Sequence, residues 1–257
     1  MKYITSNRGY VAAIAAGIVL IASVAYADHS WGGYHWARTA NPFTVKLGDN
    51  VSGAWDAHLA GAAADWSVSS VLDALVVPGK TNPKNCRAIA GRVEICDSKY
   101  GNNGWLGIAQ VWVNGTHITQ GTVKMNNTYF TTAKYNTPAW RRLVMCQEVG
   151  HAFGLDHQDE AFDNPNIGTC MDYTNDPSTN TMPNAHDYEQ LEAIYAHLDA
   201  TNTLAAGAVP PALAGIDLDN QSEWGRQVKG SANGKSSLYR RDAGNGQSIF
   251  TFVVWAD

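Results

Sequence analysis

Apolar residues recur along the chain with helical spacing in some segments and in short strand-like runs in others. Residues 55–66 carry an apolar stripe at spacings of 4, 3 and 4, which predicts an amphipathic helix. The stripe consists of Trp55, Leu59, Ala62 and Trp66. Residues 187–198 show a similar stripe and predict a second helix. Short apolar runs between turn residues predict strands at 44–47, 71–77, 92–95, 106–113 and 121–125.

Another helix is signalled at both of its ends. Thr137 can cap its N-terminus with the side-chain oxygen, and Pro138 takes the first helical position, where a missing N–H costs nothing. Apolar residues continue as far as Phe153. Gly154 follows, and glycine readily adopts the left-handed conformation that ends helices. We therefore predict a helix that runs from Pro138 to Gly154.

The composition changes after Asp199. Residues 204–214 are rich in Ala and Pro and lack a period, which is typical of a linker. Two apolar runs then flank the turn-rich residues 242–246 and predict a β-hairpin at 238–255. Because strands and helices are mixed before this point, we predict an α+β fold. The expected organisation is a domain at 28–200, a linker at 201–221 and a C-terminal β extension at 222–257.

The N-terminal residues have the features of a secretory signal peptide. Lys2 and Arg8 precede the apolar run 10–24, and Ala25-Tyr26-Ala27 is a small-residue cleavage pattern. We expect cleavage before Asp28 and a secreted protein, with an uncleaved anchor as the alternative. The apolar run is short for a membrane span. We therefore expect no membrane association after cleavage.

Charge excludes some classes of partner. Cleavage would remove two basic and no acidic residues, which leaves 16 basic against 23 acidic residues and a net charge of −7. Lys and Arg form no cluster in the sequence. A nucleic acid or an anionic membrane therefore has no electrostatic support as a partner. We expect a monomer.

All four cysteines lie beyond the predicted cleavage site. Export favours disulfides, and four cysteines permit three connectivities. We favour Cys86–Cys96, which closes a short loop, together with Cys146–Cys170. Free thiols are a poor alternative outside a reducing compartment. A Cys₄ zinc site is also disfavoured because no pair has the close spacing of such sites.

The predicted helix at 138–154 carries residues with metal chemistry. Gln147 and His151 are one helical turn apart, so both side chains can reach the same ion. Gly154 allows a sharp turn that can bring back His157 as a third ligand. Glu148 can then take a proton from an attacking water. Three protein ligands and one open position are typical of catalytic zinc.

The run from Gln147 to His157 resembles the metzincin zinc-peptidase motif H-E-x-x-H-x-x-G-x-x-H at every defined position except the first. Cys170-Met171-Asp172-Tyr173 resembles the methionine turn of that family, in the Met-x-Tyr form of the astacin and serralysin branches. The short domain resembles bacterial matrixin-like peptidases. The resemblance covers roughly residues 44–198.

The resemblance implies a zincin domain with a mixed twisted sheet, an active-site helix and a C-terminal helix. It implies a zinc-dependent endopeptidase that acts on a protein or peptide substrate, with zinc on His151 and His157. Glu148 would be the general base, and Tyr173 would bind zinc or stabilise the developing oxyanion. Residues 105–113 would be an edge strand that pairs with substrate. The Cys146–Cys170 bridge would hold the active-site helix to the methionine turn at Met171.

Gln147 leaves three outcomes open, because an amide oxygen is a weaker zinc ligand than imidazole. Gln147 can remain a weak third ligand, with Tyr173 as an addition. Another group can replace the missing histidine, and His186 and Asp172 are candidates. Finally, the site can be inactive, in which case the protein is a secreted binding module.

The remaining features receive plainer interpretations. Four acidic residues can hold calcium, although a solvated loop is the simpler reading: Asp156, Asp159, Glu160 and Asp163. Five histidines have no ligand spacing and are assigned to the surface or to packing: His29, His35, His58, His117 and His197. No cysteine lies between the predicted cleavage site and Pro42, so we expect no cysteine switch.

Overall fold

A computed structural model describes Met1 and residues 28–205, 216 and 218–256. The predicted signal segment, apart from Met1, and most of the Ala/Pro-rich stretch at 204–214 lie outside the described residues. Within the described residues, no helix combines the length and the apolar character needed to cross a bilayer.

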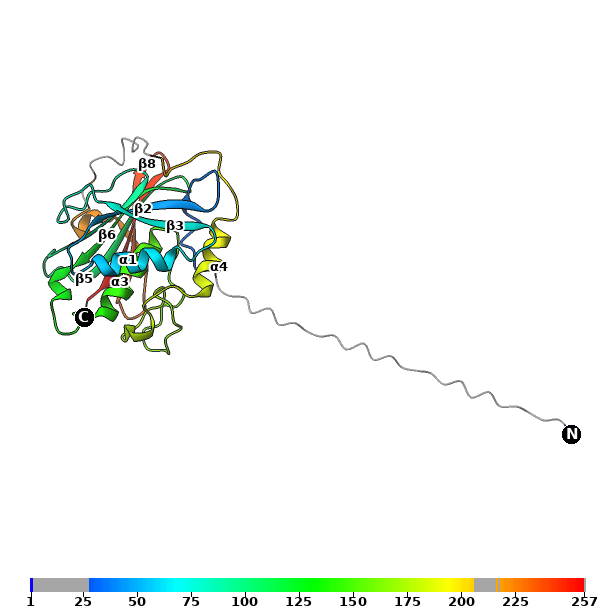
Figure 1. The fold of residues 1–257 in the computed structure, drawn as a ribbon. Helices are drawn as coiled ribbons and strands as arrows, with labels where there is room; N and C mark the ends of the chain where they lie inside the picture. The colour runs from blue at the N-terminus through cyan, green and yellow to red at the C-terminus, as the bar shows by residue number, and fades with distance from the viewer. Residues whose placement is uncertain (2–27, 206–215, 217, 257) are drawn as a thin grey trace.

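A single mixed sheet of nine strands forms the framework of the α+β fold (Figure 1). Its strand order is β3-β2-β4-β6-β5-β9-β8-β7, and β1 pairs with β6 off this path. The first part of the sheet is parallel, whereas all pairings from β6 through β5 to β7 are antiparallel. The strands are β1 His35–Trp36, β2 Phe43–Asn50, β3 Leu72–Pro78, β4 Arg92–Ser98, β5 Trp105–Asn114, β6 His117–Asn126, β7 Arg226–Gly230, β8 Ser236–Gly244 and β9 Gln247–Trp255.

The two longest helices pack against each other on one face of the sheet, and the main apolar core lies between them and the strands (Figure 1). Trp66 on the first of these helices donates its indole N–H to the Cys146 carbonyl of the second at 3.1 Å. The helices are α1 Asp56–Trp66, α2 Asn127–Phe130, α3 Pro138–His151 and α4 Ala185–Ile194, with 3-10 turns η1 Pro177–Thr179 and η3 Gln221–Glu223.

Helix α3 begins as the sequence predicts. The Thr137 hydroxyl accepts a hydrogen bond from the Trp140 amide at 3.3 Å, and Pro138 is the first helical residue. The helix ends at His151, three residues before the predicted stop. Gly154 has a φ of 102°, and a Cβ there would lie 2.5 Å from the Tyr34 carbonyl oxygen. Only glycine fits this turn without strain or displacement.

Helix α4 is shorter than predicted at its C-terminal end. A capping box between Asn184 and Asp187 fixes its start. It ends at Ile194 instead of residue 198, and the following residues turn toward β1. The Tyr195 carbonyl accepts a hydrogen bond from the Arg38 guanidinium at 2.7 Å. This hydrogen bond takes the place of the backbone bond that the Tyr195 carbonyl would accept if the helix continued.

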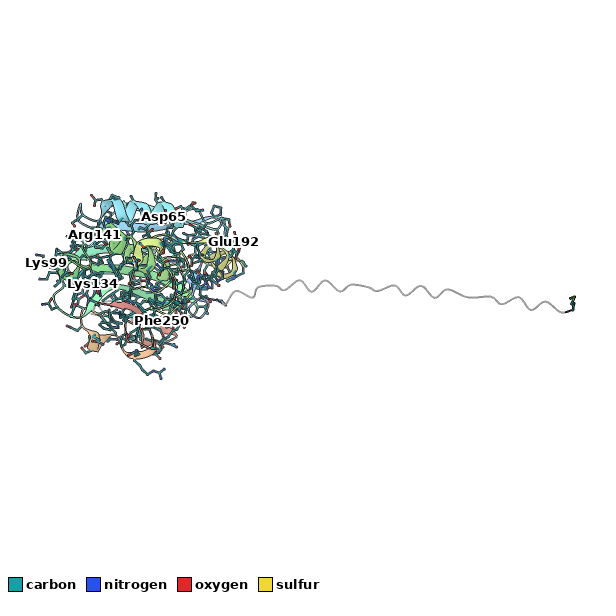
Figure 2. The ribbon with its side chains drawn as sticks, turned by 90° about the horizontal axis from the view of Figure 1, so that it is seen from below. Asp65, Lys99, Lys134, Arg141, Glu192 and Phe250 are labelled. Atoms are coloured by element: carbon teal, nitrogen blue, oxygen red, sulfur yellow. A yellow bond between two sulfur atoms is a disulfide. The ribbon has the colours of Figure 1, made fainter. Side chains whose placement is uncertain are left out.

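The C-terminal extension contains the predicted hairpin, formed by β8 and β9. It has three strands, and β9 joins them to the main sheet by pairing antiparallel with β5 along its whole length. Phe250, Phe252 and Val254 enter the main core, whereas Ile249 and Val253 enter a second core on the other face. Figure 2 marks β9 with Phe250, with α1 and its Asp65 at the opposite side of the view.

The expected free edge at residues 105–113 is therefore absent. Strand β5 has β6 on one side and β9 on the other, with Ala109 opposite both Val123 and Phe252. The outer strands of the sheet path are β3 and β7. In this arrangement β5 has no unpaired edge to offer an extended peptide.

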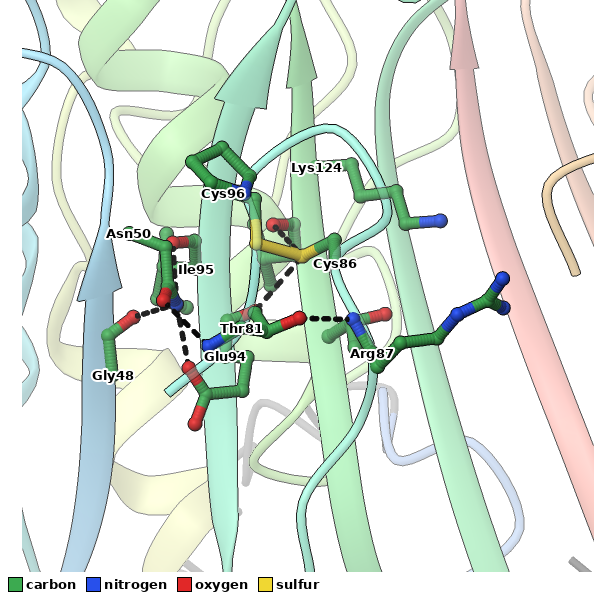
Figure 3. Close-up of a disulfide and its surroundings, with 12 residues drawn as sticks. Gly48, Asn50, Thr81, Cys86, Arg87, Glu94, Ile95, Cys96 and Lys124 are labelled. Carbon is green, nitrogen blue, oxygen red and sulfur yellow. Dashed lines mark hydrogen bonds between the residues drawn. A yellow bond between two sulfur atoms is a disulfide. The ribbon is translucent and has the colours of Figure 1, made fainter. Parts of the chain in front are cut away.

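Both expected disulfides are present. Cys86–Cys96 links β4 to the preceding loop, near the Asn50 amide, which donates to the Gly48 carbonyl at 3.1 Å (Figure 3). Cys146–Cys170 links α3 to the segment that follows it, with Cα atoms 5.9 Å apart. Two disulfides are compatible with an extracellular protein.

Candidate metal centre

His151 and His157 meet at the end of α3. The turn at Gly154 brings their Nε2 atoms to 3.1 Å from each other. The Nδ1 atom of His151 lies 2.8 Å from the Leu155 carbonyl oxygen, which can only accept. That contact requires a proton on Nδ1, so in the neutral ring Nε2 carries a lone pair.

The same reasoning applies to His157. Its Nδ1 lies 3.3 Å from a carboxylate oxygen of Asp156, which favours the proton on Nδ1 and a lone pair on Nε2. Burial lowers the pKa of His151 well below its usual range, with a further contribution from His157. Burial also lowers the pKa of His157, although Asp156 opposes this shift. Two neutral imidazoles thus direct lone pairs at one point, an arrangement that a shared cation stabilises.

Glu148 lies on the adjoining turn of α3 and is fully buried. Among the described residues, neither of its carboxylate oxygens has a hydrogen-bond partner. A Cβ at Gly107 of β5 would lie 2.9 Å from one of these oxygens, so the carboxylate packs directly against the strand. Burial raises the pKa of Glu148 well above its usual range, and the nearby Ala109 amide, which does not meet hydrogen-bond geometry, offsets this only in part. A buried carboxylate of this kind fits a site that holds a cation.

Gln147 is 1 % exposed, and its Nε2 atom lacks a hydrogen-bond partner among the described residues. The two imidazoles supply nitrogen ligands of the kind that a zinc-class ion prefers, and Gln147 lies one helical turn before His151 on α3. Over the described ranges, no third histidine, cysteine or carboxylate groups with both His151 and His157 as a ligand set.

The two proposed substitutes for the missing histidine have other contacts. His186 lies at the start of α4, where its ring centroid is 4.8 Å from that of His29. Asp172 accepts hydrogen bonds from the Ile167 amide at 3.0 Å and from Asn180 at 2.8 Å. Within the described residues, neither groups with both His151 and His157 as a ligand set.

Met171 and Tyr173 lie beside the histidine pair. Met171 is fully buried, and a Cβ at Gly150 of α3 would lie 2.6 Å from its sulfur. The Tyr173 ring is 3.8 Å from the His157 ring between centroids. Burial raises the pKa of Tyr173 well above its usual range, while a hydrogen bond with Ser236 of β8 opposes the shift. The phenol is therefore protonated at neutral pH.

The C-terminal strands cover this site. The Phe252 ring of β9 stacks on the His151 imidazole with centroids 4.1 Å apart and planes 12° apart. Lys229 of β7 forms an ion pair with Asp156 at 2.7 Å and a second with Glu160. Two of the four acidic residues proposed for calcium are thus bound to an ammonium group. That arrangement disfavours calcium there.

Three of the five histidines that have no ligand spacing lie together in the structure. His35 and His117 converge with Asp199, and His197 lies beside them, although no local spacing links these residues in sequence. His29 is buried and pairs with Asp187 at 3.1 Å. The sequence carries one sign of this grouping, because His197 and Asp199 are only two positions apart.

Comparison with known proteins adds little to this geometry. The chain matches no family model and no curated protein. One match among solved structures is the structure of myroilysin, with 11 % identity and a TM-score of 0.36. The match covers 62 % of this chain and 82 % of that chain. A similarity at this level carries no argument about activity.

Proposed function

We propose that this protein is a secreted, zinc-dependent endopeptidase. Zinc would be held by His151 and His157, with the Gln147 amide oxygen as a weak third ligand. One observation carries the proposal: the two buried Nε2 atoms of His151 and His157 lie 3.1 Å apart. Each ring has an oxygen acceptor at Nδ1, which favours the proton there and leaves the Nε2 lone pair free to bind a metal. Ligand atoms on a tetrahedral zinc ion are separated by about 3.3 Å when the zinc–nitrogen distance is about 2.05 Å.

The remaining residues would perform the proton and charge steps. Zinc, when bound, supplies Lewis-acid activation of a water molecule. Glu148 would accept the proton of the attacking water and deliver it to the leaving amine. Tyr173 is protonated and adjoins His157, so its hydroxyl would donate to the carbonyl oxygen as negative charge develops.

Hydrolysis would require a rearrangement of the C-terminal strands. In the closed arrangement β9 pairs with β5 and Phe252 covers one face of the His151 ring, so a substrate can neither add to β5 nor contact that face. Strand addition by β9 has the form that an extended substrate would take. We therefore propose that β7–β9 hold the enzyme latent, and that separation of β9 from β5 precedes catalysis.

A second function is a secreted binding module without catalysis. Gln147 and the burial of the site under β9 favour it. Zinc content separates the two: the mature protein should retain about one zinc at this site after loading and desalting if it is an enzyme. A second group of histidines could also hold metal. The zinc bound at His151 and His157 is therefore measured as the zinc content lost in the His157→Ala variant.

Activity is tested with Glu148→Ala. After a brief treatment with mild denaturant to loosen β9, the zinc-loaded protein should cleave an unstructured protein such as casein. Glu148→Ala should lose this activity and keep its zinc. Glu189→Ala removes an exposed carboxylate on α4 and should change neither. Equal cleavage by Glu148→Ala and the parent would refute the assigned mechanism.

A further inference from the structure

Three residues from separate parts of the chain direct ligand atoms to one point away from the His151–His157 pair. His35 on β1 and His117 at the start of β6 are opposite each other in a parallel pairing. The Nε2 atoms of these residues lie 3.4 and 3.2 Å from the same oxygen, Oδ1 of Asp199. Asp199 belongs to the segment that follows α4.

A fourth residue lies beside this group. The Nε2 atom of His197 is 3.1 Å from Nε2 of His35 and 3.6 Å from the same Asp199 oxygen. The His35 ring is nearly perpendicular to those of both His117 and His197, with interplanar angles of 82° and 87°. Rings that meet edge to face in this way present nitrogens to a common centre without stacking.

Hydrogen bonds to the other polar atoms of His35 and Asp199 fix the orientation of the proposed ligand atoms. The Nδ1 atom of His35 lies 2.8 Å from the Gly33 carbonyl oxygen, which requires a proton on Nδ1. The other Asp199 oxygen, Oδ2, accepts from the Arg38 guanidinium at 2.8 Å and from its backbone amide at 3.2 Å. Arg38 is itself 1 % exposed. Metal-binding histidines and carboxylates are commonly held by such outer contacts.

The tautomer of His35 leaves its Nε2 lone pair able to bind a cation. With its proton on Nδ1, a neutral His35 directs a lone pair from Nε2 toward Asp199 Oδ1, which is also an acceptor. Two acceptors at 3.4 Å repel unless a metal ion lies between them or His35 takes a second proton. Four separations within the group, from 3.1 to 3.6 Å, bracket the roughly 3.3 Å expected between ligands on tetrahedral zinc.

We propose that His35, His117 and Asp199, with His197 as a fourth ligand, bind a divalent ion of the zinc class. Four protein ligands would close the coordination sphere, which is typical of structural rather than catalytic zinc. The ion would join β1, the start of β6 and the segment after α4. This site is independent of the proposed peptidase activity.

The test removes the other site first. His157→Ala is stripped with a chelator, loaded with zinc at pH 7.5, desalted and analysed for zinc per chain. It should retain about one equivalent, and zinc should raise its melting temperature by about 5 °C at a hundredfold excess over Kd. Adding His117→Ala should abolish both effects, because it removes a proposed ligand. The His117 side chain is 33 % exposed, so it can be shortened without unfolding the chain.

Two further variants complete the comparison. His197→Ala should weaken zinc binding by at least about tenfold, since it removes one of four ligands. His58→Ala removes a histidine on α1 that contacts Trp55 and should leave zinc binding unchanged. Absence of zinc from His157→Ala, or equal retention with and without His117, would overturn the proposal. If the single substitution His117→Ala lowers the zinc content of the wild-type chain and His157→Ala does not, the result contradicts the peptidase site and supports the site at His35, His117 and Asp199.

Discussion

Phe252→Ala tests whether the C-terminal strands close the His151–His157 site. Phe252 is 2 % exposed, stacks on the His151 imidazole and contacts the Trp31 ring with centroids 5.2 Å apart. Its removal deletes the group that lies directly against the candidate metal ligand. It also weakens the attachment of β9 to the main core, while backbone pairing with β5 remains possible.

The size of the effect follows from burial. Replacing a buried Phe by Ala costs about 3–5 kcal/mol, and every 1.4 kcal/mol changes an equilibrium about tenfold. Phe252 would be exposed to water once β9 separates, so most of this cost falls on the closed arrangement alone. The fraction of molecules with an open site should therefore rise by about a hundredfold or more.

The assay reads access to the metal independently of catalysis. Cobalt(II) replaces zinc, and the visible spectrum is followed as acetohydroxamic acid is added. Phe252→Ala should change its spectrum at hydroxamate concentrations about a hundredfold lower than wild type. Val228→Ala removes an exposed side chain of β7, 42 % accessible, and should behave like wild type. A Phe252→Ala protein that is folded and cobalt-loaded but no more accessible than wild type would refute the reasoning.

Three other changes test the site and its supports. Gln147→His should raise zinc affinity about tenfold or more, measured by competition with a chromophoric chelator, because imidazole replaces an amide; no gain would contradict the assigned ligand position. Cys146→Ala with Cys170→Ala opens a loop of sequence separation 24 and should cost about 3 kcal/mol, seen by calorimetry as a fall of about 6–12 °C. Burial would raise the pKa of Asp156, but His157 and Lys229 outweigh it and lower that pKa below its usual range. Stability from the Asp156–Lys229 pair is thus complete above the unfolded pKa of about 3.9 and is lost as the pH falls further. The Lys229 side chain is 44 % exposed, so the pair is worth about 1 kcal/mol or less. The difference in melting temperature between wild type and Lys229→Met should therefore shrink below about pH 4, and a constant difference would exclude this origin.

Local signals predicted the elements that hold the candidate site. Thr137 and Pro138 start α3 through contacts within one turn, and Gly154 makes the left-handed turn that the sequence suggested. The meeting of His151 with His157 follows from helix periodicity and this single turn. These features depend on residues within about 20 positions of one another, so a sequence carries them directly.

The position of β9 depends instead on a partner far away in sequence. Alternation along a strand shows which face is buried, but it does not identify the neighbouring strand. A signal was nonetheless present in Ile249–Val254, where five of six residues are apolar. Such a run is typical of a strand buried on both faces, whereas a solvated hairpin alternates. Val253 and Phe252 do face two different cores, so this reading would have placed β9 inside a sheet.

The two groups of histidines differ in whether spacing along the sequence can predict that their residues meet in space. His151 and His157 belong to one helix and its turn, so their separation in sequence fixes their separation in space. His35 and His117 are 82 positions apart, and the parallel pairing of β1 with β6 alone places them together. A ligand set assembled by strand register has no motif that a search along the chain can find. An acceptor at Nδ1 is the more general indicator, because it fixes which ring nitrogen is free, and His151, His157 and His35 each have one.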